Sequence, residues 1–441
     1  MPTPPRVAPR AAVAAGVFLM LGVLLQLIAA YYALRPAREL LLFAGTVCFA
    51  LSFALLPDPL ALLRRRAILP AALAFLAVAV WAVLRTPSSP YPAFARAEAL
   101  RLLSGVLGFL CALTLRAEYS PLARRLLFIP LLWGCAQSFA DFYALGSRGG
   151  MTTGFQYSAF ATHEELASAL LILLPCAAAL VVFSRGETTD GETLLRRFAP
   201  PALFLVLFLA LLTARCRSAW VGAAAAALGG GVLLCSRARP PEARRTRAAW
   251  FGAVALPVFL ALLALSGFVA LTDGGGALGA RIVGKTDVGM VGRFPRWRAG
   301  VALLRRNPWT GRGLGSFVVL EQTQTGVGRT PAQVLKYGAN HLNTAYNYYV
   351  QWAVDAGLIG LALHISFLAA YLWCAFRLLR TSSDENRPLL IAAIALLAGT
   401  TADALASPSY GLPGIFSLWS VMLGFLLSEG RPGAGASQAA P

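Results

Sequence analysis

Runs of apolar residues recur along the whole chain and are separated by short polar links. Twelve such segments lie at 11–33, 39–57, 67–84, 99–115, 126–144, 165–184, 201–214, 218–235, 248–271, 351–376, 388–406 and 413–428. Most are close to the length of about 20 apolar residues that a membrane-spanning helix needs. The pattern therefore predicts an all-α fold, a polytopic transmembrane helix bundle with about 12 spans.

The longest polar interval lies between the ninth and tenth apolar segments and divides the chain. We expect residues 1–271 to form the first nine transmembrane helices and residues 351–428 to form the last three. Residues 272–350 are then a long loop outside the membrane. Residues 429–441 are rich in small residues and proline, which is typical of a disordered tail.

The long loop is predicted to carry short amphipathic helices. Apolar residues share one helical face at Phe294, Trp297, Val301 and Leu304. This helix should begin near Pro295, because proline is favoured in a first turn, and end at Arg305, Arg306 and Asn307, before Pro308. A second helix should follow His341 and run through Tyr349 into the tenth span. Helices of this kind lie on the membrane surface or against the bundle.

The composition excludes an ordinary soluble domain. The chain is 58% hydrophobic and 13% charged, with a mean hydropathy of +0.67, whereas a soluble chain carries about 25% charged residues. Seven cysteines are scattered without a C-x-x-C pair, so we expect neither a disulfide framework nor a metal site. The sequence also lacks a nucleotide-binding loop and a dinucleotide fingerprint, and we therefore expect no cofactor.

The distribution of arginine predicts the orientation of the chain. With the N-terminus in the cytoplasm, cytoplasmic links hold 20 of the 38 basic residues, Arg116 included, and short external links hold eight, Arg101 included. The other ten lie in the long external loop, to which the positive-inside rule does not apply. Both termini are then cytoplasmic. The net charge of +19 is explained by basic residues in the loops, where the positive-inside rule puts them, so we expect no nucleic-acid partner. The first apolar run is too long for a signal-peptide core and should stay as a span.

External arginines are the first candidates for a functional site. Arg215 and Arg217 lie in a short link between two apolar segments, and Arg293 opens the predicted loop helix. Arginine at membrane depth costs roughly 2.5–3.5 kcal/mol on insertion scales, so it normally faces a cavity or an anion. The alternatives are snorkelling to lipid headgroups and binding of the basic helix to anionic lipid. Converging guanidinium groups suit a phosphate or pyrophosphate, which they bind through two hydrogen bonds each.

Two histidines lie on the same predicted side as these arginines. His341 is either a general base that titrates near neutral pH or a polar residue at the start of a helix. His163 opens the sixth span and precedes Glu164 and Glu165, whose charges favour a helix N-terminus. His364 lies in the middle of a span, and we interpret it as a packing residue.

Four segments in fixed order carry a family resemblance that covers about half of the chain. They are 153–167, 212–220, 293–317 and 347–360, and they include Arg-x-x-x-Trp from Arg293 and Pro-x-x-Gly-x-Gly from Pro308. The last one ends in Asp-x-Gly-x-x-Gly from Asp355. In this order and on this side of the membrane they resemble the superfamily of O-antigen ligases and O-antigen polymerases.

The resemblance implies an inverting, metal-independent glycosyltransferase that uses a glycan linked to undecaprenyl pyrophosphate. It assigns the pyrophosphate to Arg217 and Arg293 and the activation of the acceptor hydroxyl to a histidine. The family's histidine directly precedes the asparagine, where this chain has Tyr346, whereas His341 lies five residues upstream. We take His341, Arg217 and Arg293 as catalytic candidates. The candidates for substrate binding are Arg215, Arg296, Arg312, Asn347, Tyr346, His163 and Glu164.

Three functions fit these features. The first is an O-antigen ligase that moves a finished glycan to a lipid A-core acceptor. The second is an O-antigen or exopolysaccharide polymerase that extends a growing lipid-linked glycan. The third is a transporter or flippase, which predicts paired charges at mid-bilayer, with Asp403 as the main candidate. For the transferases we expect the bacterial inner membrane, a site that faces the periplasm, and membrane lipids, the lipid-linked glycan and its acceptor as partners.

Overall fold

The computed structural model describes residues 10–29, 37–59, 65–147, 163–183, 194–214, 216–236, 288–324, 345–382 and 386–427. Within these ranges the regular elements are helices, without any strand, as the apolar pattern predicts. The ninth predicted segment, 248–271, and the predicted tail lie outside the described residues.

Each predicted apolar segment within the described ranges overlaps a helix of the structure. The helices before the loop are α1 Arg10–Ile28, α2 Arg38–Leu55, α3 Leu69–Arg85, α4 Pro92–Glu118, α5 Ser120–Leu126, α6 Phe128–Ser147, α7 His163–Phe183, α8 Leu194–Thr213 and α9 Arg217–Ser236. The later elements are α12 Val288–Arg306, α13 Ser316–Gln324, α15 Tyr348–Thr381, α16 Arg387–Ala404, the 3-10 turn η5 Ser409–Gly411 and α17 Pro413–Leu426. Proline in the first turn starts α3, α4, α16 and α17, where its missing N–H removes no helical hydrogen bond.

Five of the described helices are long and apolar enough to cross a membrane. They are Arg10–Ile28, Pro92–Arg116, Glu164–Val181, Tyr348–Thr381 and Arg387–Ala404. Shorter apolar helical stretches of 10–17 residues are Glu39–Leu55, Leu69–Arg85, Phe128–Ala140, Ala199–Thr213 and Pro413–Leu426. A multi-pass helical membrane protein is thus supported, and the count of about 12 spans stays a prediction.

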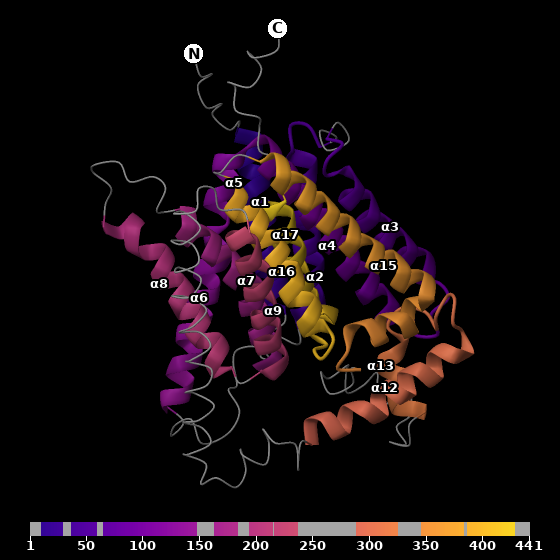
Figure 1. Cartoon of the computed structure of the whole chain (residues 1–441). Coiled ribbons are helices and arrows are strands. Elements are labelled where there is room, and N and C mark those ends of the chain that lie inside the picture. The colour runs from indigo at the N-terminus through magenta and orange to yellow at the C-terminus, as the bar shows by residue number, and fades with distance from the viewer. Residues whose placement is uncertain are drawn as a thin grey trace, which may run out of the picture.

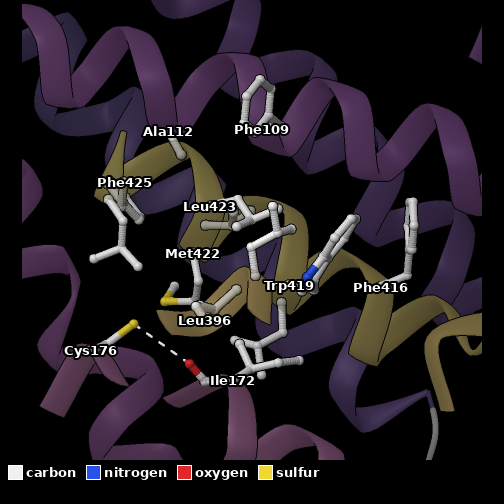
Figure 2. Packing of buried hydrophobic residues seen from close by; sticks show 14 of the residues in the cluster. Phe109, Ala112, Ile172, Cys176, Leu396, Phe416, Trp419, Met422, Leu423 and Phe425 are labelled. Carbon is white, nitrogen blue, oxygen red and sulfur yellow. Dashed lines mark hydrogen bonds between the residues drawn. The ribbon is translucent and has the colours of Figure 1, made fainter. Parts of the chain in front are cut away.

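The core of the bundle forms around α17, which packs against α4, α1 and α7. Figure 2 shows this core, where Trp419 and Met422 of α17 lie among Phe109 of α4, Ile172 of α7 and Leu396 of α16. Next to it, α16 packs against α9 and α15 packs against α3 (Figure 1).

The contact between α9 and α16 depends on glycine. A Cβ atom at Gly222 would lie 2.7 Å from the carbonyl oxygen of Gly399. Membrane helices associate closely through small residues of this kind, because the surrounding lipid is as apolar as a large side chain. The start of α9 is therefore held against the end of α16.

Two arginines that the orientation argument counted in connecting links lie inside α4 instead. Arg101 and Arg116 are buried, with 2% and 1% of their surfaces exposed. Arg101 pairs with Glu98 at 2.6 Å and donates to the carbonyl oxygen of Tyr410 at 3.0 Å, and Arg116 donates to Asn386 at 2.8 Å. A buried charge is tolerated when it is paired in this way, so these two residues hold helices together and say nothing about topology.

The loop helix α12 begins earlier than predicted. It starts at Val288, so Pro295 lies inside the helix and not in its first turn. It ends at Arg306, as predicted. Figure 1 shows α12 and α13 together at one end of the bundle, beside the start of α15.

The buried face of α12 also differs from the predicted one. Phe294 and Val301 are 50% and 44% exposed, whereas Gly300 and Leu303 are buried. The reason is the close approach to α15, because a Cβ atom at Gly300 would lie 2.6 Å from a methyl group of Val350. A pattern of large apolar residues cannot reveal a contact face that is built on glycine.

A Gly-rich loop after α12 is fastened to a kink in α15. The kink is at Gly357, which has φ 74° and ψ −179°. There the N–H groups of Leu358 and Ile359 donate to the carbonyl oxygens of Pro308 and Trp309, at 2.8 and 3.2 Å. A Cβ atom at Gly357 would collide with the Trp309 oxygen, so both the positive φ and the close approach require glycine.

Asp355 fixes the other side of the same loop. Its carboxylate accepts hydrogen bonds from the N–H groups of Phe317 at 2.8 Å and Gly315 at 3.2 Å. Its backbone oxygen accepts a third one from Gly313 at 3.1 Å. The Asp-x-Gly sequence of α15 and the glycines of the loop therefore form one structural unit, and this unit holds α12 in place.

Candidate active site at one end of the bundle

A salt bridge joins α7 to the loop helix α12. The guanidinium Nη2 of Arg293 lies 3.1 Å from Oε1 of Glu164, which is 129 positions away in the sequence. The two side chains are only 19% and 16% exposed, so water screens the pair less than it would at an open surface. Both residues are sequence candidates, and the fold brings them into direct contact.

Tyr346 lies beside two of the candidate arginines. The guanidinium carbons of Arg293 and Arg296 are 5.0 and 5.1 Å from the centre of its ring, within the range of cation–π attraction. Arg293 and Arg296 are three residues apart on α12, which puts them on one face of the helix. The residue before Tyr346 is held in place by Trp297, because the indole N–H of Trp297 donates a hydrogen bond to the backbone oxygen of Ala345 at 2.7 Å.

Arg217 is the first residue of α9, and its side chain is exposed. A cation is unfavourable at a helix N-terminus, so helix stability does not explain this residue. The exposed N–H groups of such a terminus attract anions, and the guanidinium adds to that field. Arg217 and the start of α9 are thus electropositive together.

Cys216 shows what surrounds the link between α8 and α9. Burial raises the pKa of its thiol to about 12, and the negative charges of Asp403 and Glu164 act in the same direction. The thiol is therefore neutral at physiological pH and is no nucleophile. Asp403 and Glu164 thus act electrostatically on the link between α8 and α9.

Asp403 is a buried carboxylate that joins several helices, and the sequence analysis considered it only as a possible transporter residue. It is fully buried, and its Oδ2 accepts hydrogen bonds from Ser168 of α7 at 2.7 Å and from Tyr410 at 3.1 Å. A Cβ atom at Gly222 of α9 would lie 3.3 Å from its own Cβ atom. Asp403 also interacts electrostatically with Arg293. An isolated carboxylate in an apolar segment was the sequence signal for it.

Two other predicted residues have backbone roles in the described contacts. Asn347 caps α15, since its side-chain oxygen accepts a hydrogen bond from the N–H of Val350 at 3.0 Å. Arg312 donates its backbone N–H to the oxygen of Val354 at 2.8 Å. Within the described contacts, nothing brings the Arg312 guanidinium to Arg293.

Three candidates are not tested by this geometry. Arg215 and His341 lie outside the described residues. His163 is the first residue of α7, but its side chain also lies outside what the structure describes. The assignment of His341 as the base therefore stays a prediction.

The described groups at this end are guanidinium, carboxylate and phenol groups. Arginines on two different elements can bind several oxyanions at once, whereas a single helix would offer only one row of donors. In the described part of the chain, no group of three or more His, Cys, Asp or Glu residues could hold a metal ion. The arrangement is suited to a polyanionic ligand such as a phosphate ester or a pyrophosphate.

Comparison with known proteins agrees with this chemistry. A search among curated proteins found no match to the chain. Residues 202–365, however, match a family model that is described as O-antigen ligase. This segment contains Arg217, Arg293 and Tyr346 and ends within α15. This segment of the chain is thus similar to the O-antigen ligase family, which supports the resemblance that the sequence motifs indicate.

Proposed function

We propose that this protein is a membrane glycosyltransferase that moves a glycan from an undecaprenyl-pyrophosphate carrier to an acceptor hydroxyl. The observation that carries the proposal is the cluster of Arg293, Arg296 and Tyr346, within the segment that matches the ligase family. The lipid tail of such a donor stays in the bilayer, which accounts for an enzyme that is itself a bundle of membrane helices.

The chemistry follows from the bond that breaks. The acceptor oxygen forms a new bond to the anomeric carbon, and the pyrophosphate leaves with the electron pair of the old C–O bond. Negative charge therefore develops on phosphate oxygens, and fixed guanidinium donors stabilise it in the transition state. We assign this role to Arg217 and Arg293, with Arg296 as a further donor.

The acceptor hydroxyl must lose its proton to a base on the opposite side of the sugar. We assign this role to His341, because a histidine titrates near neutral pH. Tyr346 is unsuited to it. Burial and, next, the charge of Glu164 raise the pKa of its phenol, and together they outweigh the opposite effect of Arg296 and Arg293. The phenol therefore keeps its proton at neutral pH.

We further propose that the acceptor is the lipid A-core and that the site faces the periplasm from the inner membrane. The donor chemistry is the same for a ligase and a polymerase, so only the acceptor separates them. A transferase is favoured over a transporter by Arg293 and Arg296, which lie together beside the Tyr346 ring on the loop helix α12.

The test is complementation in two bacterial strains, one without its O-antigen ligase and the other without its O-antigen polymerase. We expect the gene to restore glycan on the lipid A-core in the first strain and to leave the second unchanged. Longer lipid-linked glycan in the second strain alone would identify a polymerase. Failure in both strains, with normal membrane insertion, would count against this donor and these acceptors.

A further inference from the structure

Tyr346 has an unusual backbone conformation. With φ at 49°, it is the one residue other than glycine with a positive φ among the described residues. A bulky side chain is uncommon there, and such strain persists only where neighbouring contacts fix it. The neighbours do so here, since Ala345 accepts a hydrogen bond from Trp297 and Asn347 caps α15.

The fixed backbone sets the ring against two cations. Arg293 and Arg296 lie 5.0 and 5.1 Å from the same ring centre, so the two guanidinium groups are also near each other. Like charges at this spacing repel, and the arrangement needs a negative partner. Glu164 supplies one at Arg293, and the electron-rich face of the ring attracts both guanidinium groups.

We infer that Tyr346 is a positioning residue whose ring holds Arg293 and Arg296 in the orientation that binds the pyrophosphate of the donor. This inference rests on the proposed function. It differs from the role that the register assigns to position 346, because Tyr346 supports the two guanidinium groups and takes no proton from the acceptor. Burial keeps the phenol protonated, which agrees with a role in packing and orientation.

The positive φ of Tyr346 allows variants that test the ring and the hydroxyl separately. Tyr346→Phe keeps the ring and removes only the hydroxyl. Tyr346→Asn removes the ring, yet asparagine tolerates a positive φ better than tyrosine does. Tyr346→Asn should therefore fold at least as well as the wild type, which the midpoint of thermal unfolding in detergent would check. Arg298→Ala removes an exposed cation from the same helix and serves as the control for unspecific charge effects.

The measurement is calorimetric titration of the purified full-length variants with farnesyl pyrophosphate, a short analogue of the carrier. We expect Tyr346→Asn to bind about tenfold more weakly, the size of one desolvated cation–π contact. Arg298→Ala should stay within about twofold of the wild type. Tyr346→Phe keeps the ring but loses its hydrogen bond to Arg296, so its affinity should fall by only about threefold.

Each other outcome overturns a defined statement. A folded Tyr346→Asn variant that binds like the wild type would sink the positioning role and leave the proposed function intact. If Tyr346→Phe loses as much affinity as Tyr346→Asn, the hydroxyl and not the ring positions the arginines, and the inference is overturned. A wild-type protein that binds no farnesyl pyrophosphate would overturn the pyrophosphate site itself, and the inference with it.

Discussion

Arg293 of α12 and Glu164 of α7 form a salt bridge of 3.1 Å that ties the loop helix to a membrane-spanning helix. The two residues come from segments that 128 intervening positions separate, and neither has the other as a local neighbour. An anionic donor that approaches Arg293 meets a guanidinium that one carboxylate already orients. Glu164 is therefore part of how the site is built, whether or not it touches the substrate.

Glu164→Gln should lower transfer moderately without abolishing it. The amide keeps the shape of the side chain but loses the charge that orients Arg293. A partly exposed ion pair contributes up to about 1 kcal/mol, so we expect transfer to fall by about fivefold. The measurement is the initial rate with purified protein in nanodiscs. An unchanged rate would mean that Arg293 is oriented without Glu164.

Arg293→Ala and Arg217→Ala should each abolish glycan transfer while the protein still inserts into the membrane. Arg293→Lys should also transfer poorly, because an ammonium group cannot reproduce the two parallel hydrogen bonds of a guanidinium. Arg298→Ala, an exposed arginine on the same helix, is the matched control and should keep normal transfer. Full activity in both alanine variants at 217 and 293 would rule out their role at the pyrophosphate.

Gly357→Ala should destabilise the protein, because the new methyl group would collide with the Trp309 oxygen at a positive φ. Backbone strain of this kind costs about 1–3 kcal/mol even without the collision. Gly229→Ala is the control, since its Cβ atom would lie 3.8 Å from that of Ala398, an ordinary contact. Thermal unfolding in detergent should show a lower midpoint for the first variant alone. Equal midpoints would show that the loop can move away from the Gly357 kink without a loss of stability.

His341→Ala should lower transfer on the order of 10²–10⁴-fold, as expected for loss of a general base. In the wild type, the rate should fall as the pH is lowered below neutral, because the protonated imidazole cannot accept the proton. Tyr346 should add no titration in this range, since burial raises the pKa of its phenol above the ordinary value. EDTA should leave the rate unchanged. A normal rate in His341→Ala would exclude the assignment.

Reporter tags should establish the orientation. Tags at position 244 and at the C-terminus are expected to report the cytoplasm, and a tag at position 275 should report the periplasm. All three positions lie outside the described residues, so the test is independent of the helix packing. A cytoplasmic report from position 275 would reverse the proposed orientation.

The apolar pattern by itself determined the helical class and the positions of most of the described apolar helices. Segment length and hydropathy suffice for this, because a helix in lipid must satisfy its own backbone hydrogen bonds. The end of α12 at Arg306 was predictable for a similar local reason, since Pro308 follows two residues later. Arg217, Arg293 and Tyr346 stood out through residue chemistry and motif order.

Only the tertiary structure decided which of these residues meet. The contacts between Arg293 and Glu164, and between Asp403 and Ser168, join elements that are distant in the sequence. The buried face of α12 was mispredicted because glycine, and not a large apolar residue, makes its contact with α15. Burial of Arg101 likewise depends on Glu98 and Tyr410, which a charge count cannot weigh. Local patterns fix what each segment can do, whereas packing and charge pairing across the bundle fix which segments act together.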